Sequence, residues 1–384
     1  MASPSPGDFS PVCDVVLLTW NQLELLQPCV ESILKNTTVP IRLMIVDNGS
    51  EAPTKEYLSR VKGNDLVRIE VLTNESNLGF VGGMNRGMNE STGPYVCLLN
   101  NDTLVTPGWM REMLAVAESS PEIGIVNPAS STFGEFPPEG MSLDDYGRSL
   151  ASKHGHYVEV GECIGFAMTI SRAVLDKIGV LDTGMNRIFF EDTDYCRRAT
   201  MAGFRCVVAS ASYVFHHEHK SFKLMPEKEQ LFRENQQRFW KKWGKPVRIA
   251  WYCDSDPATD PESMKLVLSR AVEWARQNAY VHVFYPQSRK WNRHQLFDAL
   301  GLREHANVGP YGVPAVWARL YYPWRILSKR KKPYDWAYSD VPAHISTLKG
   351  IKSLHSAQVA LWSPDKTKET IPWKEETENS LSRS

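Results

Sequence analysis

The sequence predicts an α/β protein, with a mostly parallel central sheet covered by helices and a smaller C-terminal α/β domain after it. Two observations predict the first part. Apolar runs of strand length alternate with segments of helical period, and polar residues follow one strand after another. A change of composition after Gly244, where a new apolar run begins with "VRIAWY", predicts the second part. Open parallel sheets bind ligands at the carboxyl ends of their strands, so we expect the site there.

The composition of the 384 residues excludes several classes of protein. Lys and Arg together number 44, as do Asp and Glu, so the chain lacks the basic surplus of a protein that coats nucleic acid. Its seven cysteines form no CxxC pair, which argues against a disulfide framework or zinc module and fits the cytoplasm. No signal peptide is visible, and no apolar run approaches the roughly 20 residues of a membrane-spanning helix. We expect a soluble cytoplasmic protein, or one held peripherally at the inner face of the membrane.

Residues 12–243 are expected to form the first domain, after a disordered N-terminus at residues 1–11. Five strands are predicted where apolar runs are bounded by turn residues, at "CDVVLLTW", "IRLMIVDNGS", "VRIEVLT", "YVCLLN" and "IGIVNP". Helices are predicted at "LELLQPCVESILKN", at residues 53–61, within "GFVGGMNRGMNES" and at "PGWMREMLAVAES".

The rest of this domain alternates less regularly. Residues 128–160 are predicted to be an irregular insertion, because Gly, Pro and Ser are frequent there. The stretch from "GECIGF" to "HHEHKSF" predicts a strand, a helix, a loop, a helix, a strand and a histidine-rich loop. An amphipathic helix at about residues 226–243 then closes the domain.

Polar residues follow each of the first four predicted strands. Asp and Asn favour turns in any protein, so one polar strand end alone indicates little. Four in succession along one edge of a parallel sheet favour a polar cleft over turn chemistry alone. The residues are Thr19 and Asn21 after the first strand, Asp47 and Asn48 after the second, Asn74 and Asn77 after the third, and Asn100, Asn101 and Asp102 after the fourth.

Asp102 is a candidate ligand for a hard divalent cation. Mg²⁺ and Mn²⁺ prefer oxygen ligands, typically one or two carboxylates with phosphate oxygens and water. A cation shared with a diphosphate would stabilise the charge on a departing phosphate. In the alternative interpretation, Asp102 and Thr103 only cap the turn before the next helix. The short sequence "NNDT" does not decide between the two.

Three acids, Glu191, Asp192 and Asp194, begin a predicted helix in "FFEDTDYCRR". For the isolated segment, an N-terminal cap explains them equally well. The three acids repel one another, however, and Phe189 and Phe190 place apolar bulk beside them. Both effects raise the pKa of a carboxyl group. We therefore expect one of these acids to act as a base toward an acceptor hydroxyl.

The histidine-rich loop supplies one more candidate ligand. His216, His217 and His219 follow an apolar strand, but their spacing does not place three ligands on one face of an element. A single histidine that completes a divalent site, or contacts diphosphate, is the more economical hypothesis. The alternative is a set of exposed loop histidines.

Seven blocks in unbroken order closely resemble the inverting, GT-A-fold glycosyltransferases of family 2, and most of all their rhamnosyltransferase-type branch. The blocks are "TWN", "IVDNGS", "NESNLGFVGGMNRGM", "YVCLLNNDT", "GFAMTISRAVLDKIGVLD", "FFEDTDYCRRATMAGF" and "HHEHKSF". The resemblance covers about residues 12–243. It implies a GT-A fold, a nucleotide-diphospho-sugar donor, Mn²⁺ or Mg²⁺ as cofactor, and transfer to a hydroxyl group with inversion.

The resemblance also implies a role for each matching residue. Asp192 matches the family's catalytic base, with Glu191 beside it. Asp102 matches the last acid of the family's DxD motif and would hold the metal, while Asn100 replaces the first acid. His216 matches a histidine near metal or diphosphate, and His217 aligns nearly as well. The donor would be bound by Thr19, Asn21 and Asp47 around the base, by Asn77, Gly79 and Gly83 at the ribose and diphosphate, and by Asn101.

The sequence leaves the substrates open. From the resemblance, donor candidates are dTDP-rhamnose and UDP- or GDP-hexoses. The acceptor is a growing surface polysaccharide, a lipid-linked sugar or a protein, and no nucleic acid is expected. Association with a second copy of the chain is also open. Two rival functions are a nucleotidyltransferase, which would normally carry a Gly-rich basic loop absent from "TWNQLELL", and a catalytically silent glycan-binding scaffold.

Residues 247–362 are expected to form the C-terminal α/β domain, followed by a disordered tail at residues 363–384. The order of its segments is faintly similar to the N-terminal half of GT-B glycosyltransferases, which suggests docking or acceptor binding. Its segment "ARLYYPWRILSKRKKP" mixes aromatic and basic residues. A helix that faces the core and has a solvated basic end is the favoured interpretation. The second hypothesis places this segment on an anionic membrane surface.

Overall fold

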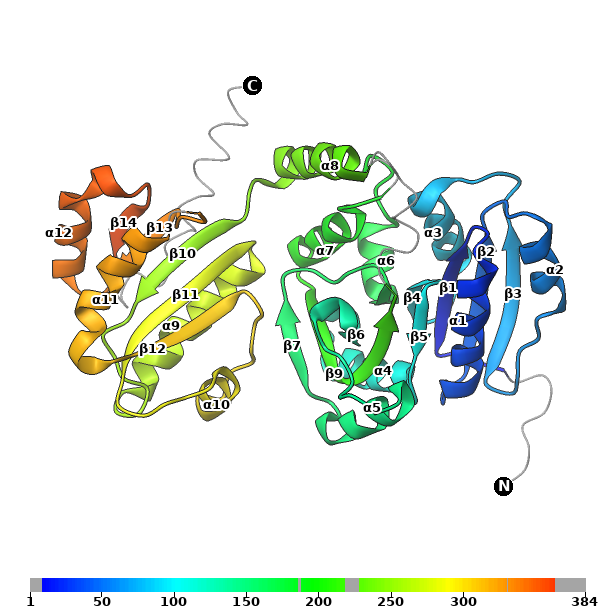
Figure 1. The fold of residues 1–384 in the computed structure, drawn as a ribbon, viewed down its shortest axis with the longest axis horizontal. Helices are drawn as coiled ribbons and strands as arrows, with labels where there is room; N and C mark the ends of the chain where they lie inside the picture. The colour runs from blue at the N-terminus through cyan, green and yellow to red at the C-terminus, as the bar shows by residue number, and fades with distance from the viewer. Residues whose placement is uncertain (1–8, 186–187, 218–227, 330, 363–384) are drawn as a thin grey trace. The chain divides into compact units, whose positions relative to one another are not determined.

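The computed structural model describes residues 9–185, 188–217, 228–329 and 331–362. The predictions of a disordered N-terminus and tail, and the histidine at 219, fall wholly or largely outside these residues. The chain divides into two compact units (Figure 1). Unit 1 runs to Val158 and from Glu162 to Lys242. Unit 2 consists of Glu159–Gly161 and the chain from Trp243 onward.

Unit 1 is built on a sheet whose strands run in the order β3-β2-β1-β4-β8-β6-β9-β5, with β7 also paired to β9. β1 to β4 are parallel to one another, as are β6 and β9, whereas β8 is antiparallel to β4 and β6, and β5 is antiparallel to β9. The strands are β1 (Cys13–Thr19), β2 (Ile41–Asp47), β3 (Val67–Thr73), β4 (Tyr95–Asn100), β5 (Thr103–Val105), β6 (Ile123–Ser130), β7 (Tyr157–Val160), β8 (Ala167–Ser171) and β9 (Arg205–His216).

The helices of unit 1 connect these strands and cover the sheet. They are α1 (Leu23–Asn36), α2 (Ala52–Arg60), α3 (Gly79–Glu90), α4 (Trp109–Glu118), α5 (Leu143–Ser149), α6 (Arg172–Ile178), α7 (Glu191–Met201) and α8 (Lys228–Trp243). Short 3₁₀ turns lie at Ser131–Phe133 and Leu150–Lys153. The central strands β1, β2 and β4 are buried on both faces, as strands of a covered parallel sheet must be.

The segment at residues 128–160 corrects one prediction. It was expected to be irregular, but β6 extends to Ser130 and is followed by α5 and β7. Ser142 caps α5, because its hydroxyl accepts a hydrogen bond from the backbone N–H of Asp145. α5 is only seven residues long, too short for a helical period to appear in the sequence.

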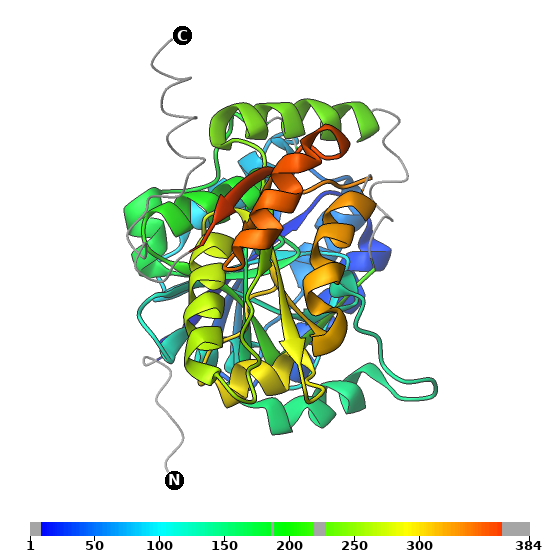
Figure 2. The same ribbon diagram turned by 90° about the vertical axis from the view of Figure 1, so that its left-hand side faces the viewer.

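Unit 2 is a separate five-stranded parallel sheet of order β12-β11-β10-β13-β14, as predicted for a smaller α/β domain. Residues of β10 alternate between two cores: Ile249 and Trp251 pack with α9 and α10, and Ala250 and Tyr252 pack with α11. Figure 2 shows α9 and α11 on either side of the strands. The elements are β10 (Val247–Tyr252), α9 (Pro261–Arg276), β11 (Ala279–Gln287), α10 (Arg293–Ala299), β12 (Val308–Pro314), α11 (Ala315–Ser328), β13 (Trp336–Ser339), α12 (Pro342–Gly350), a 3₁₀ turn (Lys352–Leu354) and β14 (Gln358–Leu361).

Within the residues that the structure describes, none of the helices has the length and apolar character that crossing a bilayer requires.

Candidate active site

The carboxyl ends of β1 to β4 lie level with one another. Thr19 of β1 pairs with Asp47 of β2, which pairs with Thr73 of β3, and on the other side Leu18 pairs with Asn100 of β4. The polar residues that follow these strands therefore meet at one edge of the sheet, where an open α/β sheet binds its ligand.

Thr19, Asn21 and Asp47 hold the loops at this edge in place. The Asn101 side chain donates to the Thr19 hydroxyl at 3.4 Å, which links the ends of β1 and β4. The Asn21 side-chain oxygen accepts from the backbone N–H of Glu51 at 2.7 Å. The buried Asp47 carboxylate accepts from the N–H of Ser50 at 2.9 Å. These contacts fix the loops after β1 and β2 against each other.

Asn48 organises the turn that leads into α3. Its amide donates to the Asn77 side chain at 2.9 Å and its oxygen accepts from the N–H of Leu78 at 3.0 Å. Asn77 in turn accepts from the N–H of Gly79 at 2.8 Å. Gly79 has φ +73°, and no atom lies within 4 Å of the position that a Cβ would occupy there. The turn therefore needs glycine for its backbone conformation and leaves open space beside it.

Gly83 does not fit the role predicted for it. It lies inside α3 rather than in the turn, and a Cβ at this position would stand 2.3 Å from Leu18 Cδ1. Its missing side chain lets α3 pack closely on β1, which is a structural function.

Asp102 and His216 meet although more than a hundred residues separate them. β5 pairs with β9 so that Thr103 lies opposite His216, and this brings His216 Nε2 to 3.2 Å from Asp102 Oδ1. Both side chains are buried. The ring of His216 stacks on Phe166, with 5.1 Å between centroids, and its Nδ1 lies 2.9 Å from the Thr132 hydroxyl. The imidazole is thus fixed on its face and at both nitrogens.

This pair fits one side of a divalent metal site. Adjacent ligands of an octahedral ion with bonds of about 2.1 Å are about 3 Å apart, close to the Oδ1–Nε2 separation. If Nε2 binds a metal, the proton stays on Nδ1 and is donated to Thr132, the kind of outer contact that orients metal-bound histidines. Two protein ligands leave the remaining positions for diphosphate and water. The turn-cap alternative is supported for Thr103, whose hydroxyl donates to the Asn100 carbonyl at 2.8 Å.

His217 contacts Asp102 through its backbone N–H and not through its ring. Its N–H donates to the Asp102 carbonyl at 2.9 Å, and its ring makes an edge contact with Phe215. Side chains alternate along a strand, so the residue after His216 points to the other face. Of the two described candidates, the structure places His216 beside Asp102.

Asp192 is held by three hydrogen bonds. Its Oδ2 accepts from the N–H of Gly165 at 3.0 Å, and its Oδ1 accepts from the N–H and hydroxyl of Thr193 at 2.7 and 3.3 Å. Loss of water around the group nevertheless raises its pKa above the ordinary value for Asp. A carboxylate that is fixed, desolvated and more basic than usual is suited to accept a proton.

Glu191 differs from Asp192 in having no partner for one of its oxygens. Its side chain is buried, and Oε2 has no hydrogen bond. Burial and the neighbouring Asp192 carboxylate raise the pKa of Glu191 to about 8. Asp192 accepts hydrogen bonds from Gly165 and Thr193, whereas Glu191 Oε2 has no partner among the described residues, so a negative charge on this pair is better stabilised on Asp192.

Glu191→Gln is expected to change the pH dependence of stability. The folded pKa of Glu191 exceeds its unfolded value, so its contribution is fully present below about pH 4.5 and is lost as pH rises toward about 8. The wild-type protein should therefore lose about 2–4 kcal/mol of unfolding free energy across this window that the glutamine variant keeps. Urea unfolding at pH 5.5 and pH 8.5 measures the difference. Parallel pH profiles of the two proteins would contradict a neutral, buried Glu191.

Asp194 has a structural role and is not part of the pair formed by Glu191 and Asp192, which we call the acid pair. It is fully buried, and its carboxylate bonds to Arg198 Nε at 3.0 Å and to Lys242 Nζ at 2.7 Å. The three acids at the start of α7 therefore do not form one repelling cluster, because two cations neutralise Asp194.

The turn before α7 is strained. Phe189 and Phe190 both have left-handed backbone conformations, with φ of 72° and 69°, which bulky residues rarely adopt. The side chain of Asn235 in α8 donates to the carbonyls of Ile188 and Phe189, at 2.7 and 3.2 Å. Phe232 of the same helix contacts both phenylalanine rings. Helix α8 thus holds the turn that presents Glu191 and Asp192.

Glu162 is a candidate that sequence reasoning missed. It is exposed, and the surrounding protein and the Asp192 carboxylate raise its pKa, which places it next to the acid pair. Its position before an apolar strand in "GECIGF" offered no sign of this, because the contact is with α7, almost thirty residues further on.

The segment Gly165–Phe166 connects the acid pair to the candidate metal site. The N–H of Gly165 bonds to Asp192, and the next ring, Phe166, stacks on His216. The Phe166 carbonyl accepts from the N–H of Asn100 at 2.9 Å, two residues before Asp102. The two acids that the sequence singled out therefore lie on either side of one short segment.

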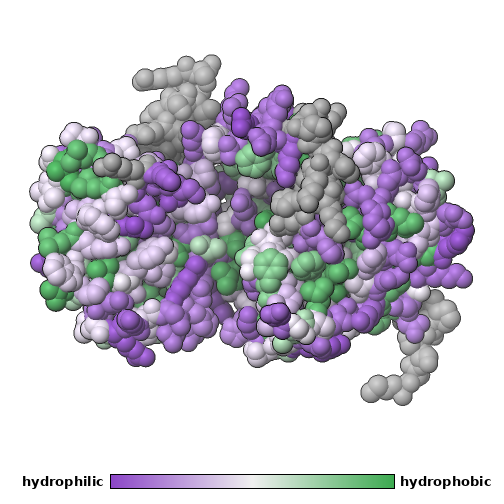
Figure 3. All heavy atoms as spheres, viewed as in Figure 1, coloured by the Kyte–Doolittle hydropathy of each residue, from purple (hydrophilic) through white to green (hydrophobic). Residues whose placement is uncertain are grey.

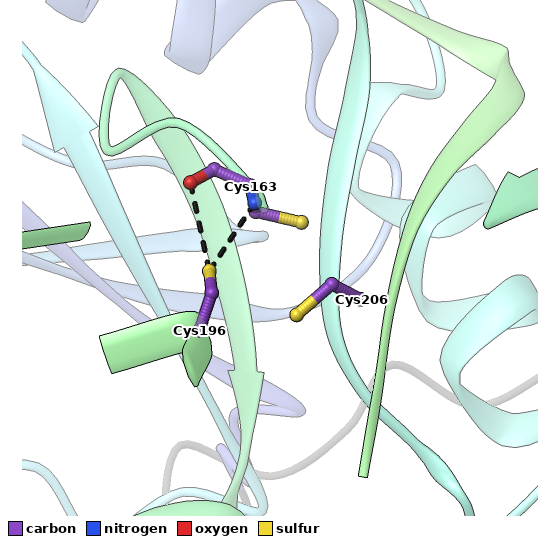
Figure 4. Close-up of side chains that lie close together, drawn as sticks. All are labelled: Cys163, Cys196 and Cys206. Carbon is purple, nitrogen blue, oxygen red and sulfur yellow. Dashed lines mark hydrogen bonds between the residues drawn. The ribbon is translucent and has the colours of Figure 1, made fainter. Parts of the chain in front are cut away.

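Three buried cysteines lie close together, and one of them, Cys163, is two residues before Gly165 (Figure 4). The sulfur atoms of Cys163, Cys196 and Cys206 are all within 4.8 Å of one another. Burial raises the pKa of the Cys163 and Cys196 thiols well above the ordinary value, and both donate to carbonyl oxygens. Protonated thiols that are already hydrogen-bonded are poor metal ligands, so we interpret the cluster as core packing. All seven cysteines of the chain are buried and free, in agreement with the sequence analysis.

Comparison with known proteins finds a family similar to part of the chain. The sequence model of the family described as "Glycosyl transferase family 2" matches residues 14–179. Residues 14–179, less than half of the chain, are thus similar to this family. Unit 1 has the α/β fold with a largely parallel central sheet that the sequence predicted. The match includes Asp102 but ends before Asp192 and His216.

Two curated relatives extend the similarity. "Uncharacterized protein y4gI" of Sinorhizobium fredii is 28% identical over 261 residues, which are 62% of this chain but only 28% of that protein. The chain thus spans well under two thirds of that relative. "Glucosyl-dolichyl phosphate glucuronosyltransferase" of Haloferax volcanii is 25% identical over 253 residues, 62% of this chain and 77% of that protein.

Among solved structures, the mannosyltransferase PcManGT from Pyrobaculum calidifontis, in complex with GDP-Man and Mn²⁺, aligns over 99% of this chain and 82% of its own. Its identity is 13% and the TM-score 0.43, a similarity too low to inform on ligands or chemistry.

Proposed function

We propose that unit 1 is an inverting glycosyltransferase that moves a sugar from a nucleotide-diphospho-sugar to an acceptor hydroxyl. The observation that carries this proposal is the Gly165–Phe166 segment, which holds a basic carboxylate on one side and an Asp–His pair on the other. Inverting transfer needs these two groups close together. The carboxylate activates the acceptor hydroxyl, and a metal held by the Asp–His pair would stabilise the leaving diphosphate.

Asp192 is the proposed base. As the acceptor oxygen forms its bond to the anomeric carbon, Asp192 takes the hydroxyl proton, and the bond from that carbon to the diphosphate breaks on the opposite face. The Gly165 and Thr193 donors favour the ionised form of Asp192 and fix its orientation. Glu191, neutral beside it, adds no second charge that would repel a diphosphate.

Asp102 and His216 are the proposed metal ligands. A bound Mn²⁺ or Mg²⁺ would offset the negative charge of the departing nucleoside diphosphate. Thr132 and Phe166 hold the His216 ring so that Nε2 faces Asp102.

The donor is proposed to bind at the ends of β1 to β4. Thr19 and Asp47, the last residues of β1 and β2, and Asn21 in the loop after β1 would surround the nucleotide base. Asn77 and Gly79 form the turn with open space beside it, suited to ribose and diphosphate. Asn101 links this region to the end of β4, next to Asp102.

The sugar and acceptor are proposed by class. Donor candidates remain dTDP-rhamnose and UDP- or GDP-hexoses. Among acceptors, a lipid-linked sugar gains support from the Haloferax volcanii relative, whose name describes transfer to glucosyl-dolichyl phosphate. Assembly of a surface polysaccharide or glycan, at the inner face of the cytoplasmic membrane, would use such an acceptor.

A panel of nucleotide sugars tests the proposed donor class. One member, at about a hundred times its Kd with Mn²⁺ present, is expected to raise the Tm of unit 1 by about 5 °C, since ligand binding stabilises only the folded state. Matched nucleoside monophosphates serve as controls and should give smaller shifts. A panel of dTDP-, UDP- and GDP-sugars that produces no shift with either metal would contradict the proposal.

A further inference from the structure

Helix α11 has two apolar faces, and only one of them is packed. Ala318, Tyr322 and Ile326 are buried against the sheet of unit 2. This agrees with the favoured prediction of a core-facing helix. Four large apolar residues nevertheless remain exposed on the same helix: Val316 (85%), Trp317 (63%), Leu320 (69%) and Trp324 (57%). We refer to these four as the α11 apolar face.

The α11 apolar face is continuous. Val316, Leu320 and Trp324 are spaced four residues apart and so lie along one side of the helix over about 12 Å, with Trp317 beside the first of them. The Trp324 ring also contacts Tyr321, with 5.4 Å between centroids. Figure 3 shows apolar residues on the surface around the position at which Figure 1 labels α11. Contiguous exposed apolar surface of this kind usually marks an interaction site.

A cluster of basic residues follows the apolar face. No acidic residue occurs between Glu304 and Asp335. Arg319 is committed to an ion pair with Asp254, but further cations lie at the end of the helix and beyond it. We define the basic cluster as Arg325, Lys329, Lys331 and Lys332, of which the last two are exposed.

The cations of this region lie close enough to affect one another. Partial burial, then Arg325, Arg248 and Lys332 in that order, lower the pKa of Lys329. Burial, with Arg248, Lys329 and Arg325, lowers the pKa of His282 to about 4. The end of α11 therefore carries a local positive field.

We propose that the α11 apolar face and the basic cluster together dock unit 2 on an anionic membrane surface. A helix at the membrane interface inserts tryptophan and aliphatic side chains at the level of the lipid headgroups, while its Lys and Arg residues contact anionic lipids. A second copy of the chain fits less well. A two-fold contact through this face would place one basic cluster close to the other, with no acidic residues of the segment to offset the repulsion.

The test is flotation of the full chain with vesicles at 50–100 mM salt. Wild-type protein is expected to float with vesicles of phosphatidylcholine and about 30% phosphatidylglycerol, and to stay unbound with pure phosphatidylcholine. Trp317→Ser with Trp324→Ser should lower partitioning about tenfold or more, because both anchors leave the apolar face. Lys331→Gln with Lys332→Gln should lower it by a similar factor and weaken its dependence on salt.

Matched substitutions elsewhere control for general effects. Phe136→Ser removes an equally exposed aromatic residue of unit 1, and Lys55→Gln with Lys62→Gln removes two exposed lysines. Both control variants should float like wild type. Failure of the wild-type chain to bind acidic vesicles, or equal losses in the controls, would overturn the proposal. So would a dimer in light scattering that the Trp317→Ser, Trp324→Ser variant converts to a monomer. None of these outcomes bears on sugar transfer by unit 1.

Discussion

Asp192→Asn is expected to lower kcat for sugar transfer by about 10²–10⁴-fold, the usual contribution of a general base. Asparagine keeps the shape of the side chain and can still accept from the N–H of Gly165, so the loop should stay in place. Donor binding, measured by thermal shift or calorimetry with Mn²⁺, should change by less than about threefold. Loss of kcat with binding retained is the signature of a group that acts on the acceptor proton.

The pH profile gives a second readout for Asp192. Because desolvation raises its pKa, the acidic limb of kcat/KM should lie above the ordinary range for Asp, and activity should rise as the group ionises. Asp176→Asn is a matched control on the exposed surface of α6 and should leave both kcat and the profile unchanged. Turnover of Asp192→Asn near that of the wild type would remove this residue from the role of base.

Asp102→Ala is expected to lower the metal-dependent affinity for donor by about 100-fold or more. The alanine variant loses the proposed carboxylate ligand and leaves His216 alone. Calorimetric titration of the donor with and without Mn²⁺ should show that the metal no longer strengthens binding. Thr132→Val, which only removes the contact to His216 Nδ1, should cost about 10-fold.

A surface carboxylate provides the comparison for Asp102. Asp65→Ala removes an exposed acid from the loop before β3 and should leave the effect of Mn²⁺ on affinity intact. If Asp102→Ala binds donor as tightly as Asp65→Ala in the presence of Mn²⁺, then Asp102 has no part in metal binding, and its contact with His216 is a structural hydrogen bond.

Most strands of the sheet could be predicted from the sequence because the apolar pattern that marks each strand lies within the strand itself. The strands β1, β2 and β4 are mostly apolar runs, and β3 alternates apolar with charged residues. Helix α1 shows its helical period over fourteen residues, so the predicted helix and the observed one coincide. β5 is only three residues long and was missed, since no period is visible at that length. The antiparallel direction of β8 likewise has no local signature.

Only some residues of the candidate site could be predicted, namely those whose sequence neighbours form a recognisable pattern. Asp102 and Asp192 stand out because of what surrounds them in the chain, whereas their neighbours are contributed from far away. Nothing near Thr132 or Glu162 in the sequence indicates that they approach His216 and Asp192. Gly83 shows the opposite error, because a glycine in a motif was taken for a ligand contact when its function is close packing on Leu18.

Phe189 and Phe190, whose backbones are left-handed, imply that the turn before α7 changes conformation before the protein unfolds on warming or in low urea. Each costs about 1–2 kcal/mol, and the contacts from α8 offset that cost. Warming or low urea that loosens α8 would let the turn relax to an ordinary backbone conformation. Glu191 and Asp192 would then move from their positions while the sheet is still folded. Catalytic inactivation should therefore precede global unfolding.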